Sequence, residues 1–209
     1  MLEHVYKFDW NIFQFIEKHL WNPVLDVILK VITTTGKWGA IFMVIAVGLF
    51  VYGFFTKKDK PKQAAMAVAI SIVIMEVTSN LIVKKVFARP RPFNFEWSQF
   101  SWAGQFNFPE IVSRPDSFSF PSGHATSAFA GAFAINRYYK KGGVCAYIFA
   151  AVMAFSRVYL HVHYCTDVLA GAVCGLVYGL IGFIIVKLIY NFFNDKIFRP
   201  IEKVFKISE

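Results

Sequence analysis

Charged residues and cysteines are both scarce in this chain. Of its 209 residues only 17% are charged, and only three are cysteines, Cys145, Cys165 and Cys174. Because they form no C-x-x-C pair, the sequence offers neither a disulfide framework nor a cysteine metal site. We therefore expect all three thiols to be buried and to take no part in the chemistry. The first 18 residues lack the basic start and clean apolar run of a signal peptide, which predicts that this segment is not cleaved.

Apolar residues dominate instead. Hydrophobic residues make up 56% of the chain and aromatic residues 18%, and the mean hydropathy is +0.49, whereas soluble domains are about 45–50% apolar. Runs long enough to cross a bilayer occur at 37–56, 63–83, 124–140, 143–160 and 167–191. The sequence therefore predicts an all-α, polytopic membrane helix bundle of about five spans, folded as a single domain over residues 1–209.

The N-terminal segment, residues 1–36, shows a different pattern. Between residues 9 and 32, polar residues recur every three or four positions opposite an apolar stripe. The members of the stripe are Ile12, Phe13, Ile16, Leu20, Val24 and Ile28. This pattern predicts a helix that lies in the membrane interface and is interrupted near Pro23, with a sixth span as the alternative.

The net charge of +9 comes from basic residues at the ends of the apolar runs. Since they do not gather on one soluble face, anionic lipid headgroups explain the charge better than nucleic acid does. Three basic segments fall on one side if five spans alternate: the loop at 56–62, the turn at 137–143, and the tail with Lys196, Arg199, Lys203 and Lys206. The positive-inside rule makes that side cytoplasmic, so we expect a multi-pass plasma-membrane protein.

Three short stretches then fall on the opposite, extracytoplasmic face. They are KKVFARPRP at 84–92, PSGH at 121–124 and SRVYLHVHYCTD at 156–167. In the first, the seven-residue spacing of Lys84 and Arg91 predicts that they share a helical face and bind one anion, and Pro90 and Pro92 are expected to end the helix. In the second, Ser122 is the expected N-cap of a helix whose first amides form a second anion cradle.

Two histidines have different expected surroundings. His163 and Asp167 lie four residues apart, which predicts that the carboxylate holds one imidazole nitrogen and leaves the other as an oriented nucleophile or base. His124 comes from another helix and could give a proton to a leaving oxygen. A third histidine, His161, is expected to point elsewhere on a helix and to be structural or solvent-facing.

Four further charged residues near these stretches carry open interpretations. For Lys85, Arg89 and Arg114 we favour a cation at a helix end that reaches toward the interface. Glu76 lies inside the second apolar run, where it is either functional or satisfied by polar neighbours in the bundle.

At these stretches the chain resembles the type 2 phosphatidic acid phosphatase (PAP2) superfamily, whose pattern is K-x6-RP, PSGH and SR-x5-H-x3-D. Every fixed position of the pattern is filled here, whereas Arg89 would need a lysine where the chain has Ile82. The resemblance implies a core like that of vanadium haloperoxidases and a mechanism without a metal or other cofactor. It implies that the phosphoryl oxygens are bound by Lys84, Arg91, Ser122, Gly123 and Arg157. It further implies that His163 attacks phosphorus, Asp167 orients it and His124 protonates the leaving group.

The short form of the chain is most similar to the bacterial undecaprenyl-diphosphate phosphatases of this superfamily. The implied reaction converts undecaprenyl diphosphate to undecaprenyl phosphate through a phosphohistidine. A phosphatidylglycerophosphate or phosphatidate phosphatase is the alternative, and a lipid-binding or transport protein without hydrolysis is a third hypothesis. The loop at 93–120 carries nine aromatics among its 28 residues, which predicts an extracytoplasmic aromatic belt, compatible with a lid over the headgroup.

Overall fold

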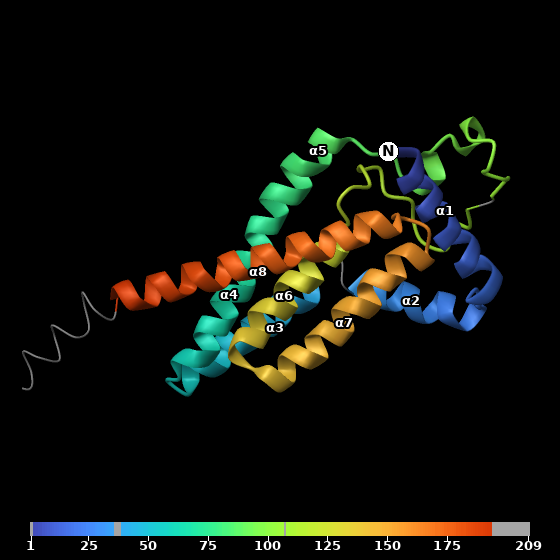
Figure 1. The fold of residues 1–209 in the computed structure, drawn as a ribbon. Helices are drawn as coiled ribbons and strands as arrows, with labels where there is room; N and C mark the ends of the chain where they lie inside the picture. The colour runs from blue at the N-terminus through green and yellow to red at the C-terminus, as the bar shows by residue number, and fades with distance from the viewer. Residues whose placement is uncertain (1, 36–38, 107, 194–209) are drawn as a thin grey trace, which may run out of the picture.

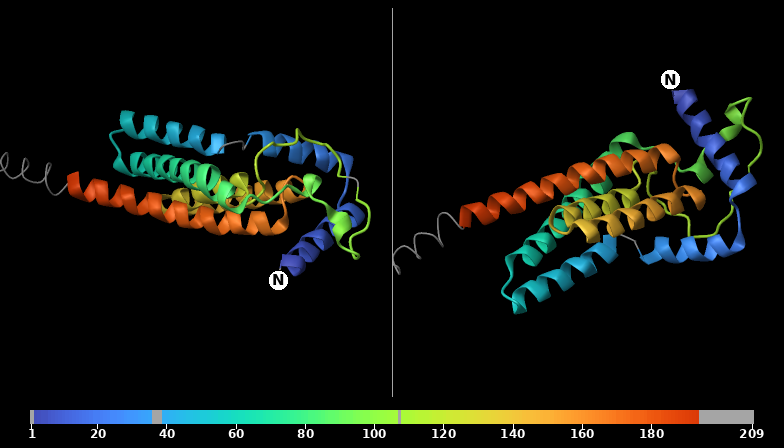
Figure 2. Two further views of the ribbon diagram at one scale, coloured as in Figure 1. Left: turned by 90° about the horizontal axis from the view of Figure 1, so that it is seen from above. Right: turned by 60° about the horizontal axis from the view of Figure 1, so that its bottom comes forward.

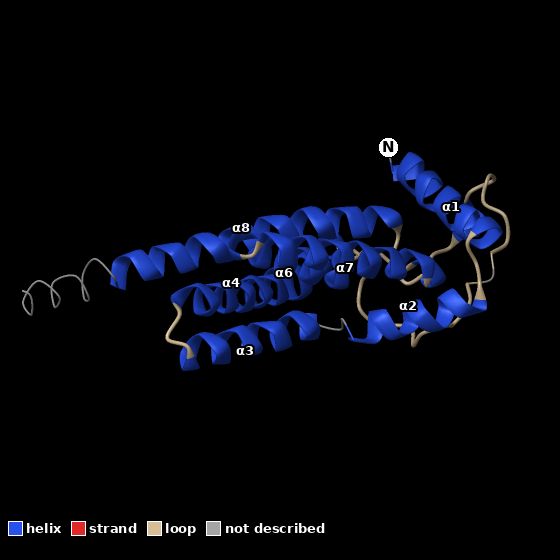
Figure 3. Ribbon diagram, turned by 90° about the horizontal axis from the view of Figure 1, so that it is seen from below, coloured by secondary structure: helices blue, strands red, loops and turns tan. Residues whose placement is uncertain are grey.

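The structure, a computed structural model, describes residues 2–35, 39–106 and 108–193. Throughout these ranges the regular elements are helices (Figure 3), which confirms the predicted all-α class. The basic tail expected on the cytoplasmic side lies outside the described residues.

The five predicted spans correspond to a bundle of helices (Figure 1). These are α3 (Ala40–Phe55), α4 (Asp59–Met75), α6 (Gly123–Tyr138), α7 (Lys140–Tyr159) and α8 (Cys165–Phe193). In the described chain, three helical segments are long and apolar enough to cross a membrane, Asp59–Asn94, Lys140–Tyr159 and Cys165–Phe192, and α3 is a shorter apolar helix. The remaining helix, α6, packs against α4, α7 and α8 and buries mostly alanine, glycine and serine, so close helix approach explains its central place.

Glycines allow α8 to approach α6 closely. Three of them repeat every four residues along α8: Gly171, Gly175 and Gly179. A Cβ at Gly175 would stand only 2.5 Å from the Thr126 carbonyl oxygen. The close approach brings the start of α8 against the start of α6, where the Ser122 N–H donates to the Asp167 carbonyl oxygen at 3.0 Å.

Beyond α4 the chain continues as a π-helical segment, η2 (Glu76–Val83), and a last turn, α5 (Lys84–Phe87). The helix stops at Ala88, whose φ of +43° is left-handed. Arg89 and Arg91 both precede prolines, which disfavours the helical conformation, and Arg91 is extended with φ −76° and ψ 159°. The prediction that Lys84 and Arg91 share a helical face is therefore wrong.

The N-terminal segment forms two helices, α1 (Leu2–His19) and α2 (Pro23–Thr35), at the end of the bundle that carries the three motifs (Figure 2). The predicted interruption is confirmed, and Asn22 Oδ1 accepts the Val24 N–H at 2.8 Å at the start of α2. The predicted stripe does not continue across it. Phe13 and Ile16 are buried, but Val24 is 66% exposed.

The aromatic loop packs on α1. It contains two short turns, η3 (Pro92–Asn94) and η4 (Trp97–Gln99). The Phe95 and Tyr6 ring centroids lie 4.3 Å apart, and the Trp97 ring, largely buried, lies 4.7 Å from the Trp10 ring. These rings pack the loop against α1.

The cysteines also differ from the prediction. Cys145 is exposed on α7, and Cys165 and Cys174 are partly exposed on α8. In a membrane bundle an apolar run faces lipid as well as the core, so hydropathy alone did not indicate which thiols are buried.

Candidate active site

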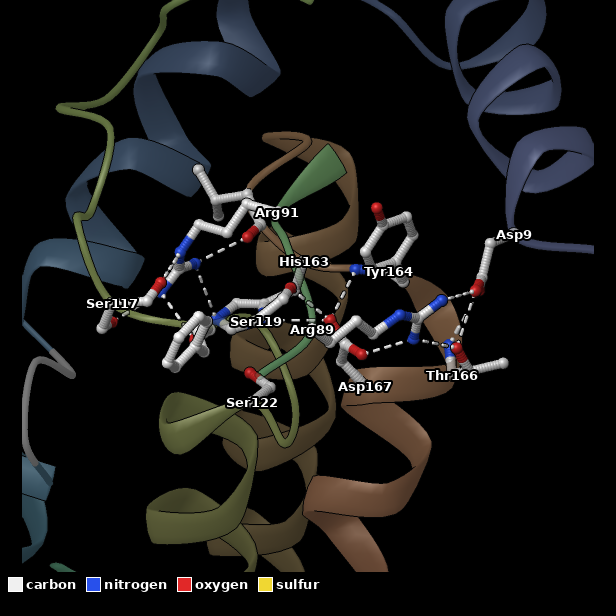
Figure 4. A network of polar contacts seen from close by, with 12 residues as sticks. Asp9, Arg89, Arg91, Ser117, Ser119, Ser122, His163, Tyr164, Thr166 and Asp167 are labelled. Carbon is white, nitrogen blue, oxygen red and sulfur yellow. Dashed lines mark hydrogen bonds and ion pairs between the residues drawn. The ribbon is translucent and has the colours of Figure 1, made fainter. Parts of the chain in front are cut away.

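The three motifs meet around one cavity of about 460 Å³ at the α1 end of the bundle. Six predicted site residues line it: Lys84, Arg91, Gly123, His124, Arg157 and His163. Ser122 and Asp167 are fully buried next to these residues (Figure 4). The structure thus brings all eight predicted residues to one site, and α2, η2 and the loop around Arg114 supply the other walls.

His163 presents its Nε2 atom to Arg91. The distance from Nε2 to Arg91 Nη1 is 3.2 Å, and the guanidinium is fixed by the carbonyl oxygens of Ser117 and Val162, each at 2.7 Å. Burial, followed by the nearby arginines and lysine, lowers the pKa of His163 well below its usual range. A pKa lowered in this way favours the neutral imidazole, which carries a lone pair on one ring nitrogen.

Asp167 reaches His163 through Ser119. His163 Nδ1 lies 3.5 Å from Asp167 Oδ2, which is long for a direct hydrogen bond. Ser119 Oγ lies 3.3 Å from Nδ1 and donates a short hydrogen bond to Oδ2. The predicted pairing is present, but its predicted basis is wrong, because His163 lies in the turn before α8 and shares no helical face with Asp167.

The start of α6 supplies a second set of anion-binding groups. Ser122 occupies the N-cap position, as predicted, but its side chain makes no capping hydrogen bond. Its buried hydroxyl has no partner within the described ranges, so it remains available to an oxyanion together with the amides of the first turn. Gly123 allows the start of α6 to lie close to η2, since a Cβ at this position would stand 3.1 Å from Asn80 Oδ1.

Sequence reasoning missed Thr33, Arg89 and Ser119, which contact predicted residues, and Asp9, which contacts Arg89. Thr33 Oγ1 of α2 accepts a short hydrogen bond from Arg157. Arg89 is largely buried and donates to Asp167 Oδ1 at 2.6 Å. The doubled Arg-Pro of ARPRP was the available signal for Arg89, whereas the other three are isolated polar residues that gave none.

Of Lys85, Arg89 and Arg114, which were each interpreted as a cation at a helix end, one fits that interpretation. Lys85 is exposed at the end of the helix. Arg89 is largely buried and forms ion pairs with Asp9 and Asp167 instead. Arg114 lies in the loop, where it lines the cavity and pairs with Glu110 at 3.7 Å. His161 is buried against Phe106 and does not line the cavity, in agreement with a structural role.

Glu76 and Asn80 line the same cavity from η2. Glu76 Oε2 accepts a hydrogen bond from Asn80 Nδ2 at 2.7 Å. The other two oxygens, Glu76 Oε1 and Asn80 Oδ1, are buried without a partner among the residues that the structure describes. A polar neighbour therefore satisfies only half of the carboxylate.

Comparison with known proteins agrees with the motifs. Residues 61–195 match the PAP2 superfamily. The chain is 28% identical to the lipid A 4'-phosphatase of Porphyromonas gingivalis, over 85% of this chain and 72% of that protein. It is 27% identical to the undecaprenyl-diphosphatase BcrC of Bacillus subtilis, over 78% of this chain and 75% of that protein.

Among solved structures, the transmembrane PAP2-type phosphatidylglycerolphosphate phosphatase from Bacillus subtilis is similar, with a TM-score of 0.59 and 25% identity. The similarity covers 93% of this chain and 88% of that one. The helical fold, the cavity formed by three separate motifs and the match over most of the sequence show that this chain belongs to the PAP2 superfamily of membrane phosphatases.

Proposed function

We propose that the chain hydrolyses a lipid phosphate or diphosphate through a phosphohistidine on His163. Nε2 forms a bond to phosphorus while the P–O bond to the leaving group breaks, and His124 gives that leaving oxygen a proton. Water then attacks phosphorus, His124 takes a proton from it, the N–P bond breaks and phosphate is released. The observation that carries this proposal is the position of the His163 ring, held between Arg91 and Ser119 at the wall of the cavity.

The phosphoryl oxygens face two groups of donors in this proposal. Lys84, Arg91 and Arg157 supply positive charge, and Ser122 and Gly123 supply a hydroxyl and helix-start amides. These donors surround the phosphoryl oxygens, so they stabilise charge on the oxygens as it builds in the transition state.

Undecaprenyl diphosphate is the first candidate substrate, hydrolysed on the extracytoplasmic face of the plasma membrane. A relative, BcrC of Bacillus subtilis, carries the name undecaprenyl-diphosphatase. The turn between α3 and α4 and the turn between α6 and α7, both rich in lysine, lie at the opposite end of the bundle from α1 (Figure 1). The cavity lies at the α1 end. The positive-inside rule therefore supports an active site facing out of the cytoplasm.

A phosphorylated lipid with a hydroxyl- or amide-bearing headgroup is the second candidate. Glu76 Oε1 and Asn80 Oδ1 can accept hydrogen bonds from such a headgroup, and leaving buried acceptors unpaired is costly. A polyprenyl chain has no donor to offer them, whereas a phosphorylated sugar or glycerol has. The names of two similar proteins, a lipid A 4'-phosphatase and a phosphatidylglycerolphosphate phosphatase, agree with this chemistry.

A substrate panel tests these candidates. Purified wild type and Glu76→Gln are assayed in detergent for phosphate release from undecaprenyl diphosphate, phosphatidylglycerophosphate, phosphatidate, lipid A and glucose 6-phosphate. Fastest release from undecaprenyl diphosphate, kept in Glu76→Gln, supports the first candidate. Faster release from a headgroup lipid, selectively lost in Glu76→Gln, supports the second. Tight binding of a lipid without any phosphate release would instead identify a lipid-binding or transport protein.

A further inference from the structure

Asp9 of α1 is completely buried, although it lies outside the three motifs and outside the residues that match the family. Its Oδ1 accepts the Thr166 N–H at 2.9 Å, and its Oδ2 accepts the Thr166 hydroxyl at 2.7 Å and Arg89 Nη2 at 2.8 Å (Figure 4). A carboxylate is tolerated in such a place only when it is paired and hydrogen-bonded. All of these partners belong to the catalytic end of the bundle.

Arg89 connects Asp9 to Asp167. Its Nη1 donates to Asp167 Oδ1 at 2.6 Å while its Nη2 donates to Asp9 Oδ2 at 2.8 Å. Its Cζ lies 3.7 Å from the centroid of the Tyr164 ring and 4.9 Å from that of the Tyr6 ring. Because the guanidinium is planar and is held by two carboxylates and two rings, its orientation is fixed.

In this arrangement the two carboxylate oxygens of Asp167 have different hydrogen-bond partners. Oδ1 is held by Arg89, and Oδ2 accepts hydrogen bonds from Ser119 and from the Tyr164 N–H at 3.2 Å. Oδ2 is also the oxygen nearest to His163 Nδ1. Without the charge of Asp9, both guanidinium nitrogens could turn toward Asp167 and draw its carboxylate away from Ser119.

We propose that Asp9 and Arg89 are a positioning pair for Asp167. They fix the rotamer of Asp167 and, through Ser119, the direction of the His163 ring, so that α1 is part of the catalytic apparatus. This inference rests on the phosphohistidine mechanism proposed above.

The test compares Asp9→Asn, Arg89→Gln and the double variant on the lipid of the panel that the wild type turns over fastest. Asp9→Asn keeps the size of the side chain, and we expect kcat to fall on the order of ten- to a hundred-fold, because the nucleophile loses its alignment. KM and the affinity for orthovanadate should stay within about two-fold, since no residue that lines the cavity changes. The double variant should be no slower than Arg89→Gln, because Asp9 acts through Arg89.

The matched control is Asp26→Asn, the same change in the neighbouring helix α2. Asp26 Oδ1 accepts the Tyr159 hydroxyl at 2.8 Å and does not line the cavity, so kcat should be unchanged. If Asp9→Asn does not fold, Arg89→Lys replaces it in the test, because lysine keeps the positive charge but cannot donate to both carboxylates through a planar guanidinium. A lower kcat with unchanged vanadate affinity would support the positioning pair, and a wild-type kcat would overturn it. A wild-type kcat in Asp9→Asn, an equal loss in Asp26→Asn, or additive losses in the double variant would also overturn it.

Failure of the proposed function gives a different result. If His163→Ala and Asp167→Asn keep full turnover, or if the wild type hydrolyses no lipid of the panel, the phosphohistidine mechanism fails and the positioning pair fails with it. If those two variants are inactive and Asp9→Asn is as fast as the wild type, only the positioning pair fails.

Discussion

Arg91 Nη1 lies 3.2 Å from His163 Nε2, and because a guanidinium can only donate hydrogen bonds, Nε2 is the acceptor. The ring proton is thereby assigned to Nδ1, which faces Ser119 and Asp167. Arg91 thus covers the lone pair that has to attack phosphorus. A phosphoryl group offers Arg91 charge-assisted partners that are stronger than a neutral imidazole, so arrival of the substrate would draw the arginine to the phosphate and free the nucleophile.

His163→Ala is expected to abolish turnover and leave the fold intact, because it removes the attacking nitrogen. Asp167→Asn should be severely impaired, because an amide is a poorer partner for Ser119 and for Arg89. Phosphate release by purified protein measures both, with the melting temperature as the control for folding. More than a few per cent of the wild-type rate in His163→Ala would contradict a phosphohistidine.

Activity should survive EDTA, and orthovanadate should inhibit. The positive charge around the cavity comes from lysine and arginine, which can take the place of a divalent ion in binding phosphoryl oxygens. Within the described ranges no three His, Cys, Asp or Glu side chains gather as a metal site would require. Phosphate release before and after dialysis against chelator is the measurement, and a strict requirement for Mg²⁺ would refute the prediction.

Gly175→Ala should destabilise the protein, because its Cβ would stand 2.5 Å from the Thr126 carbonyl oxygen where α8 meets α6. Overpacking of this kind costs about 1–3 kcal/mol. Gly48→Ala in α3 is the matched control, since nothing lies within 4 Å of its Cβ position, and it should be neutral or slightly stabilising. Thermal unfolding in detergent measures both, and equal melting temperatures would argue against the close packing of α6 and α8.

The sequence predicted which motif residues meet, because that result depends only on the alternation of spans and on the spacing within each motif. The sequence did not predict the contacts through which these residues interact. The contact of His163 with Asp167 runs through Ser119, which comes from the loop, and no local spacing encodes that contact. Asp9 could not be recognised either, since a single acid in an amphipathic helix resembles a solvent-facing residue and its partner Arg89 is 80 positions away.

His161 should make the protein less stable in acid. Its ring packs 5.2 Å from the Phe106 ring, and burial lowers its pKa to about 4. An unfolded histidine has a pKa of about 6.5 and therefore takes up a proton that the folded protein excludes. Above about pH 6.5 the ring is neutral in both the folded and the unfolded protein, so His161 does not lower the free energy of unfolding. Below about pH 6.5 this free energy falls, by about 2 kcal/mol at pH 5.

His161→Asn tests this expectation. Asparagine tolerates the left-handed φ of +54° at this position and does not titrate. The variant should be less stable than the wild type at pH 7.5 because packing is lost, yet its melting temperature should fall less between pH 7.5 and pH 5. Parallel pH profiles of the two proteins would show that His161 does not contribute the acid sensitivity.

Single cysteines should report the sidedness of the active site. In a variant without Cys145, Cys165 and Cys174, a cysteine at exposed Ser98 in the aromatic loop should react with a membrane-impermeant thiol reagent in intact cells. A cysteine at exposed Lys60, beside the turn between α3 and α4, should react only after the membrane is opened. The reverse pattern would turn the cavity toward the cytoplasm and remove the case for an outward-facing lipid phosphatase.

A cysteine at Lys7 extends this test to the N-terminal segment. Lys7 is exposed on α1, and its neighbour Tyr6 stacks on Phe95 of the loop, so Lys7→Cys and Ser98→Cys should label alike. Like labelling would exclude the sixth span that the sequence left open, because α1 and the loop would share one side of the membrane. Protection of Lys7→Cys alone would contradict the packing of α1 over the cavity, and with it the route by which Asp9 reaches Arg89.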